Sequence, residues 1–564
     1  MTRLIGSCTV AVLLAMTRLG AAGSDLADAA MRGDTAAVRA LLARQVAVDA
    51  RQADRATALH WAVYRSDLVI TDLLIRAGAN PTVANREGAT PLSLACLTGS
   101  TPIIMRLLDA GADPNEQLPR GETALMMASR TGNVAAMMAL LDRGAQVNAT
   151  ERLRGTTALM WAADQGHADA IQLLIARGAD INARSNPASR GRTAYLGKAN
   201  DPRKSNKALV AAAAGATPEE VAALAAKVSL QRQQQQLESP REEPDSSGGG
   251  LTPLVYAARA NSLASVKTLL AAGADVNEAT SYGWTALLVA TQNRFYQLGA
   301  FLIDQGADVN AANKGGWTPL YLAVDNRNIE GGDYPVRKGD MDHLDFIRML
   351  LDNRADPNAR MKDSTETRTV FTSQWLDEDG ATAFLRAAQS SDLVVMRLLL
   401  AHGADPKLAT VGGVTALQVA AGIGWVDGLT YEWSEGANVE TVELLLDLGI
   451  DPNAQADTGR TALHGAAHKG RTAIVQMLVD HGARLDTRDY GMTGNDAGGK
   501  LAVHTWQPVD YADGLVRVGV QSAVAHPETG LLLRKLMLER GLEAPPIGRT
   551  LASVCITEIC DDGQ

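Results

Sequence analysis

Aromatic residues are scarce in this chain: Phe, Trp and Tyr make up only 4% of its 564 residues, although 46% are hydrophobic. The apolar content is therefore mostly Ala, Leu and Val. This composition suits short, closely packed helices, because Ala has the highest helix propensity and lets neighbouring helices approach closely. The length exceeds what a single hydrophobic core usually serves, so several domains or a repeat array are expected.

An excess of basic residues is also lacking, since the net charge is -10 and the isoelectric point is near 5.5. Proteins that bind nucleic acids or anionic membranes usually have a basic face, so neither is expected as a partner of this chain. Long apolar runs are missing as well. Beyond the N-terminus no stretch reaches the ~18 apolar residues of a spanning helix, so no stable membrane insertion is expected once the N-terminal segment is removed.

The N-terminus resembles a secretory signal. Arg3 gives a positive start, residues 4–16 form a short apolar run, and small residues follow up to a cleavage site after Ala22. Arg18 interrupts this pattern, and an uncleaved N-terminus is the alternative. The sequence therefore predicts a signal peptide over 1–22 and an exported protein, either periplasmic or secreted.

Cysteine is rare, with four copies and no CxxC motif, which argues against zinc-ribbon and c-type haem sites. Cys8 belongs to the signal segment, and Cys96 is predicted on a buried helix face. Cys555 and Cys560 lie five residues apart near the C-terminus. In an exported protein they are a possible disulfide, and two unpaired thiols are the alternative.

Catalytic and cofactor motifs are lacking too: no GxSxG, dinucleotide-binding or EF-hand pattern occurs in the sequence. His464 and His468 have the spacing of a two-histidine metal site, but no HExxH pattern supplies the remaining groups. The sequence of residues 494–500 nearly matches that of a phosphate-binding loop, but Leu501 stands where such a loop has the Ser or Thr that binds the metal. We interpret 494–500 as a flexible insertion, and we expect no catalytic residue, metal or cofactor.

Repetition, by contrast, is pervasive. A phrase such as Thr57-Ala-Leu-His-Trp-Ala or Thr90-Pro-Leu-Ser-Leu-Ala recurs, often 33 residues apart. Its opening Thr stands at positions 57, 90, 123, 157, 252, 285, 318, 382, 415 and 461. About 22 residues later a second phrase follows, such as Gly111-Ala-Asp-Pro-Asn or Gly306-Ala-Asp-Val-Asn. Ten copies at matching spacing indicate a repeat protein.

Each position of the repeat has a physical role. The Thr can cap a first helix, and Pro is tolerated at the first turn because its missing N–H would be unpaired anyway. Leu and Ala two to five places later form a buried face. A second helix carries apolar residues at helical spacing, and the Gly of the second phrase ends it. One such helix pair cannot bury its own apolar face, so copies must stack.

Period, opening phrase and closing phrase closely resemble the ankyrin-repeat family, in a secreted, bacterial, multi-repeat form. The resemblance covers most of residues 25–541. It implies an all-α repeat solenoid of helix-turn-helix units joined by β-hairpin loops, about twelve units with both caps. It also implies a scaffold for protein–protein interaction, without catalysis, that binds another protein as a monomer. At positions 60 and 464 the family's usual His has a structural, hydrogen-bonding role.

The repeats are interrupted. We predict an N-terminal cap and four full repeats in 23–185, and six full repeats and a degenerate C-terminal cap in 250–541. Residues 186–249 form an insertion with a helix near 218–236, and 542–564 form a tail. A continuous stack across the insertion is favoured, because the cost of closing a loop rises slowly with its length. Two separate arrays are the alternative.

Candidate binding residues follow from the resemblance and from further insertions. Ankyrin-type proteins bind through hairpin tips and the exposed side of the first helix, which here means Tyr64, Arg65, Arg130, Asp164, Arg259, Tyr282, Trp284, Asn293, Arg294, Lys314 and Trp317. Trp284 and Trp317, at equivalent places, could form an exposed strip or pack on the adjacent hairpin. Insertions at 326–341, 361–379 and 422–438 carry aromatic candidates, namely Tyr334, Trp375, Trp425, Tyr431 and Trp433.

Two roles remain open for these aromatic insertions. Exposed aromatics on loops are candidate binding anchors, whereas aromatics that fold back over the stack would be local core. The alternative function is an enzyme or effector whose site the three insertions form.

Overall fold

The computed structural model describes residues 22–186, 249–328, 338–362, 379–425, 430–495, 501–516 and 524–549, together with positions 207 and 223. The predicted signal peptide apart from Ala22, the predicted helix near 218–236 apart from position 223, and Cys555 and Cys560 lie outside the described residues. The chain divides into two compact units. Unit 1 comprises Met1–Ser189 and Ser247–Tyr282, and unit 2 comprises Arg190–Ser246 and Gly283–Gln564.

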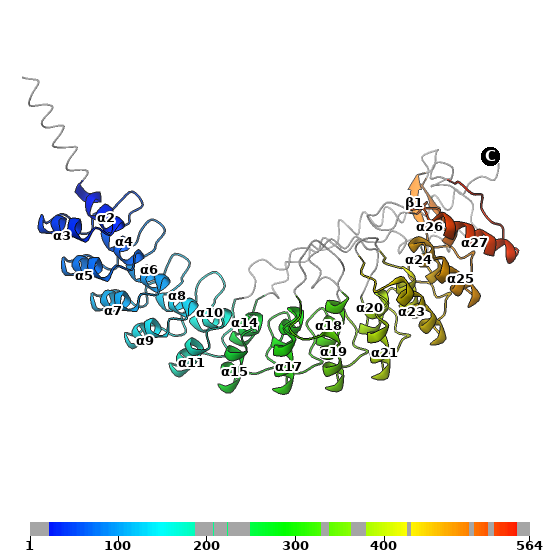
Figure 1. Ribbon diagram of the computed structural model, residues 1–564, viewed down its shortest axis with the longest axis horizontal. Helices are drawn as coiled ribbons and strands as arrows, with labels where there is room; N and C mark the ends of the chain where they lie inside the picture. The colour runs from blue at the N-terminus through cyan, green and yellow to red at the C-terminus, as the bar shows by residue number, and fades with distance from the viewer. Residues whose placement is uncertain are drawn as a thin grey trace, which may run out of the picture. The chain divides into compact units, whose positions relative to one another are not determined.

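The described part of unit 1 consists of six helix pairs in two layers (Figure 1). The first helices of successive pairs pack on one another, and so do the second helices. The pairs are α2 (Ala22–Arg32) and α3 (Thr35–Ala43), α4 (Ala58–Tyr64) and α5 (Leu68–Arg76), α6 (Pro91–Thr98) and α7 (Thr101–Asp109), α8 (Ala124–Thr131) and α9 (Val134–Asp142), α10 (Ala158–Asp164) and α11 (Ala168–Ala176), and α14 (Pro253–Arg259) and α15 (Leu263–Ala271).

Unit 2 repeats this arrangement in its described residues (Figure 1). Its pairs are α16 (Ala286–Gln292) and α17 (Tyr296–Asp304), α18 (Pro319–Arg327) and α19 (His343–Asp352), α20 (Ala383–Gln389) and α21 (Leu393–Ala401), α22 (Ala416–Ala421) and α23 (Glu435–Asp447), α24 (Ala462–Lys469) and α25 (Thr472–Asp480), and α26 (Pro508–Ala512) and α27 (Pro527–Glu539). The fold is thus the all-α repeat solenoid that the sequence predicted.

One β-hairpin corrects the interpretation of residues 494–500 as a flexible insertion. Strand β1 (Met492–Asn495) pairs antiparallel with β2 (Leu501–His504), and Met492 stands opposite His504. Residues 494 and 495 are therefore part of a strand, because paired backbone groups on both sides extend the hairpin that precedes the last helix pair. Residues 496–500 lie outside the described part.

The repeated Thr is the N-cap residue of the first helices from α4 to α24. The Thr123 hydroxyl accepts a hydrogen bond from the N–H of Met126 at 3.3 Å, and Thr252 does the same for Val255 immediately before Pro253. Each satisfies an N–H that the helix itself leaves without a partner. At the other end of the unit Gly111 has φ +92°, a left-handed conformation that stops the second helix at little cost only for Gly.

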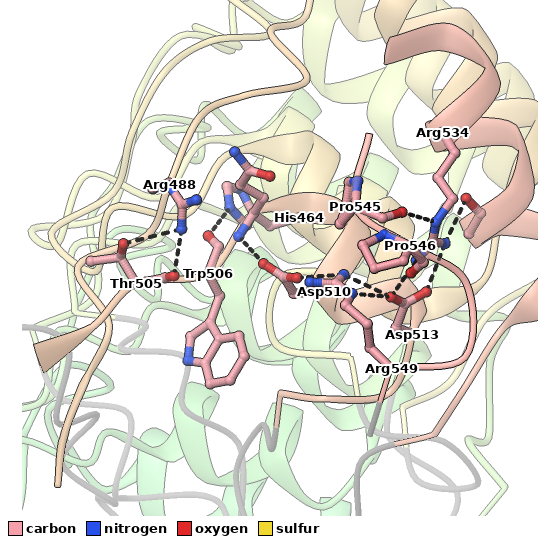
Figure 2. A network of polar contacts seen from close by, with 12 residues as sticks. His464, Arg488, Thr505, Trp506, Asp510, Asp513, Arg534, Pro545, Pro546 and Arg549 are labelled. Atoms are coloured by element: carbon pink, nitrogen blue, oxygen red, sulfur yellow. Dashed lines mark hydrogen bonds and ion pairs between the residues drawn. The ribbon is translucent and has the colours of Figure 1, made fainter. Parts of the chain in front are cut away.

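His60 and His464 connect neighbouring units, as their place in the repeat predicted. The N–H of Thr57 donates to Nδ1 of His60 at 3.1 Å, so Nε2 carries the proton and lies 3.1 Å from the carbonyl of Ala89 in the next hairpin. Burial lowers the pKa of His60, which favours this neutral form. His464 is held in the same way and reaches the carbonyl of Trp506 at 3.2 Å (Figure 2).

The stack passes directly across the insertion at 186–249. Helix α10 packs on α14 and α11 packs on α15, although about ninety residues separate them in the sequence. The N–H of Ser185 donates to the carbonyl of Leu251 at 3.0 Å, and that of Gly250 donates back to Ser185 at 3.2 Å. The insertion therefore leaves and re-enters at the tip of one hairpin, and the two flanking repeats remain neighbours.

The last helix pair is joined to the start of the tail by a charged cluster (Figure 2). Arg534 makes a two-pronged contact with Asp513, at 2.9 and 2.6 Å, and also donates to the carbonyl of Pro545 at 2.8 Å. Arg549 lies 2.7 Å from both Asp510 and Asp513. These contacts cover the end of the stack with polar groups, as a terminal repeat requires.

A buried ionic network links the first helices α18 and α20 of unit 2 and the start of the second helix α21. Arg386 on α20 contacts Asp325 on α18 at 2.6 Å, with side chains only 2% and 9% exposed. Its guanidinium also donates to Ser390 and to the carbonyl of Asn328. Arg327 contacts the buried Asp392 at 2.8 Å. Every carboxylate in the network has a cationic partner, which is the condition for burying charge without a large penalty.

We expect Arg386→Ala to lower the free energy of unfolding by about 3–5 kcal/mol, because it leaves the buried Asp325 carboxylate without its cation. The control Arg348→Ala removes an exposed pair with Asp345 and should cost no more than about 1 kcal/mol. Urea unfolding followed by circular dichroism measures both. The double variant Asp325→Leu/Arg386→Leu should be more stable than Arg386→Ala, and equal effects of Arg386→Ala and Arg348→Ala would contradict the network.

Candidate protein-binding surfaces

The exposed ends of the first helices form one row along unit 1. The row consists of the residue seven places after each opening Thr: Tyr64, Leu97, Arg130, Asp164 and Arg259. Tyr64 and Leu97 are 60% and 51% exposed and occupy equivalent positions in neighbouring repeats. The row is therefore apolar at its N-terminal end and charged at its C-terminal end.

A pocket of about 320 Å³ opens beside the charged end of this row. We call it the arginine pocket. Its walls come from two hairpins and from helices α8, α10 and α14, all of unit 1, and its lining residues are Arg120, Glu122, Arg130, Glu151, Leu153, Arg154, Thr156, Met160, Trp161, Asp164, Gln165, Tyr256 and Arg259. Three predicted binding residues, Arg130, Asp164 and Arg259, are thus brought together in one site.

Aromatic faces and cations alternate in this pocket. The guanidinium of Arg130 lies 5.9 Å from the ring centre of Trp161, and that of Arg259 lies 4.9 Å from the ring centre of Tyr256. Arg259 also forms an ion pair with Asp164 at 2.6 Å. Such contacts between cations and aromatic faces hold the long Arg side chains in defined positions.

The carboxylates that line the pocket differ in how fully other groups of the protein already bind them. Glu151 is buried and accepts hydrogen bonds from the N–H groups of Leu153, Arg154 and Thr156 and from the Thr156 hydroxyl, at 2.7–3.1 Å. Burial opposes ionisation of Glu151, but these hydrogen bonds outweigh it and lower the pKa. The Glu151 carboxylate is therefore occupied by hydrogen bonds within its own hairpin.

Arg120 and Arg154 were not among the predicted site residues. Both are exposed, and each stands three places before the opening Thr of its repeat, in two consecutive repeats. The N–H of Arg152 donates to the carbonyl of Arg120 at 2.8 Å, so the two hairpins lie side by side. This repeated Arg was visible in the sequence, but only the pocket shows that its two copies border the same space as Trp161 and Tyr256.

Two predicted binding residues of unit 2 are buried, which corrects their assignment as exposed candidates. Trp317 is 0% exposed and packs edge-on against Tyr321 at 4.9 Å. Arg294 is 5% exposed and donates to the carbonyl of Asn326 at 3.1 Å. Trp317 therefore belongs to the core of its repeat, and no exposed strip joins it to Trp284.

The remaining candidates near these two are half-buried. Trp284 and Asn293 are of this kind in unit 2, and Tyr282 is so in unit 1. The Asn293 amide donates to the carbonyl of Val289 at 2.8 Å within its own helix.

The described part of insertion 422–438 is tied to the stack by its tryptophans. Trp433 is 41% exposed, yet its Nε1 donates to Asn328 at 2.9 Å and its ring lies 4.5 Å from the guanidinium of Arg327. Tyr431 packs edge-on against Trp433 at 5.6 Å. The half-buried Trp425 ring lies 4.1 Å from Nζ of Lys469. Tyr334 and Trp375 of the other two insertions lie outside the described residues.

Beneath this insertion Lys469 is almost fully enclosed. Its ammonium group lies 2.5 Å from Glu432, and Arg471 contacts the same carboxylate at 2.8 Å. Burial lowers the pKa of Lys469 to about 8, against the opposing attraction of Glu432. The arrangement holds the insertion onto helix α24, because two cations from that repeat meet one carboxylate from the loop.

Among the residues that the structure describes, no three His, Cys, Asp or Glu side chains are grouped as metal ligands. No described helix combines the length and the hydrophobicity needed to cross a bilayer.

Comparison with known families agrees with this architecture. The model "Ankyrin repeats (3 copies)" matches residues 26–118, 97–185, 273–361 and 429–497, which together exceed half of the chain. The model "Ankyrin repeats (many copies)" matches residues 238–290. The chain belongs to the ankyrin-repeat family, a class whose folds support protein–protein interaction.

Curated relatives are similar over limited segments. SH3 and multiple ankyrin repeat domains protein 2 of Homo sapiens is 26% identical over 27% of this chain and 10% of its own length. A transient receptor potential cation channel subfamily A member 1 homolog of Caenorhabditis elegans is 31% identical over 20% and 8%, respectively. Serine/threonine-protein kinase 12 of Arabidopsis thaliana is 40% identical over 12% and 16%. The chain thus spans at most about a sixth of each relative.

The lowered pKa of Lys469 predicts a pH dependence of stability. Between pH 8 and the ordinary lysine pKa of about 10.4, the unfolded state binds the proton and the folded state does not, so the free energy of unfolding rises with pH. Lys469→Met should lack this rise. The measurement is urea unfolding of both proteins at pH 7.5 and 10, compared as a difference. A parallel pH response of the two proteins would contradict the prediction.

Proposed function

We propose that this protein is a binding scaffold that captures another protein through the first-helix row and the arginine pocket of unit 1, and that it has no catalytic activity. The observation that carries the proposal is the exposure of Tyr64 and Leu97 in line with the pocket. Surfaces that combine exposed apolar groups with arginines and aromatics are typical of binding sites. A monomer suffices, since unit 1 alone supplies the whole surface.

The alternative of an enzyme formed by the insertions has no support from the described part of 422–438. Its Trp425 and Trp433 contact the stack through Lys469, Arg327 and Asn328. Lys469 has a lowered pKa, but it is enclosed by Glu432 and Trp425 and faces no open space in the described residues. These contacts favour attachment of the loop over chemistry.

Apolar contacts at the first-helix row can be tested with a closely matched control. We expect Tyr64→Ala/Leu97→Ala to weaken capture of a protein partner from an envelope extract of the source organism by at least about tenfold. Met105→Ala/Met138→Ala removes two side chains that are 45% and 43% exposed on the second helices of neighbouring repeats. This control should capture normally, and circular dichroism should show equal helix content in all three proteins.

Equal capture by the two double variants would remove the first-helix row from consideration. Loss of capture in both would show that repeat stability, rather than the exposed row, governs binding.

We further propose export, in a bacterial source to the periplasm or the medium, on the strength of Arg3, the apolar run at 4–16 and the small residues before Gly23. Expression of the full chain in a bacterium, followed by fractionation and intact mass measurement, should yield a protein that lacks residues 1–22. Leu13→Arg should abolish this processing. An unprocessed cytoplasmic protein would refute export, and the mass change on reduction reports whether Cys555 and Cys560 are bonded.

A further inference from the structure

Three guanidinium groups of the arginine pocket have no carboxylate partner among the described residues: those of Arg120, Arg130 and Arg154. Arg130 leans on Trp161, and the other two stand exposed at hairpin tips. Arginine binds carboxylates through two parallel hydrogen bonds and is less strongly hydrated than lysine, so such groups are well suited to a carboxylate-bearing ligand.

We infer that the arginine pocket binds an acidic, extended peptide segment of the partner, an inference that rests on the proposed function. The acidic residues that line the pocket leave arginines available to such a segment. Asp164 is paired with Arg259 at 2.6 Å, and Glu151 is bonded to its own hairpin, so Glu122 is the one lining acid for which the structure shows no such engagement. In a chain of net charge -10, this local excess of available cations gives charge complementarity to an acidic segment.

The repeat geometry sets the spacing of the acids. Arg120 and Arg154 occupy equivalent positions in consecutive repeats whose hairpins are joined by the Arg152 to Arg120 backbone hydrogen bond. Packed helices lie about 8–10 Å apart, and a segment in the extended polyproline II conformation advances about 3.1 Å per residue with three residues per turn. Two acidic side chains three residues apart in such a segment lie on one face, about 9 Å apart, and therefore match the two arginines.

Two apolar residues that line the pocket suit an apolar residue close to the acids of the segment. Leu153, which lines the pocket next to Arg154 in the sequence, is 60% exposed, and Trp161 is half-buried with Nε1 already bonded to Thr156 at 2.8 Å. The Trp161 ring therefore offers its face rather than its donor. An apolar side chain that lies across Leu153 and this face would exclude water from the flanking carboxylate contacts.

The test uses the full chain and fluorescein-labelled decapeptides in a Gly/Ser background. Each peptide carries one Leu and two Glu residues placed two, three, four or five positions apart, and a matched set carries Lys in place of Glu. Fluorescence anisotropy at 50 and 300 mM salt gives the affinities. We expect the spacing of three to bind most tightly, the Lys set to bind at least tenfold more weakly, and high salt to weaken the Glu set.

The decisive comparison is between two double variants of equal charge change. Arg120→Ala/Arg154→Ala should weaken the best Glu peptide by about tenfold, in keeping with the loss of two partly exposed charged contacts. Arg143→Ala/Arg177→Ala removes arginines of the neighbouring second-helix ends, where they pair with Asp109 and Asp142, and should change binding by less than about twofold.

Several results would overturn the inference. These are equal binding of the Glu and Lys sets, no dependence on spacing, equal losses in the two double variants, or tighter binding of a ten-residue oligothymidine with the same dependence on Arg120 and Arg154. A protein partner that Arg120→Ala/Arg154→Ala still captures at wild-type strength would leave the scaffold function standing and refute the acidic segment. Absence of any partner together with absence of peptide binding would contradict both.

Discussion

The packing of each helix pair on the next is the interaction on which this structure depends. A pair such as α10 and α11 exposes apolar side chains on both faces, and only its neighbours on either side remove Leu159, Ile171 and Leu174 from water. Stability is therefore a sum over interfaces between repeats, in contrast to a single central core. The same requirement explains how repeats that flank a 64-residue insertion can stay in contact, since a break there would leave two apolar faces open.

Stacking also determines where binding groups can appear. The buried faces of the repeat leave the hairpin tips, the first-helix ends and the outer sides of the second helices free to vary. In unit 1 they carry Arg120, Arg154 and Tyr64 and remain open. In unit 2 the residue equivalent to Tyr64 in one repeat is Asp325, which is buried and paired with Arg386 in a network that the loop containing Trp433 reaches through Asn328. The repeat position that is exposed at Tyr64 in unit 1 is thus buried in an ion pair at Asp325 in unit 2.

Much of the fold was predictable because local sequence signals specify the repeat. The opening Thr, the Pro or Ala that follows and the Gly of the second phrase act within one turn, so their effects do not depend on distant contacts. The site was predictable in part. Arg130, Asp164 and Arg259 follow from their place in the repeat, whereas Trp317 was wrongly taken as a candidate surface residue. Its burial depends on Tyr321 in its own repeat and on neighbours that no local pattern specifies.

The sequence by itself determined the class of fold, the number and spacing of the opening phrases and the caps of the helices, because period, capping residues and glycines are short-range features. Only the tertiary structure decided which exposed-looking residues are open. Trp317 and Arg294 became core, Trp433 became a link to Arg327, and Arg120, Arg154 and Trp161 became one pocket. These outcomes depend on side chains from adjacent repeats meeting across the stack, and that meeting is set by the register of packed helices.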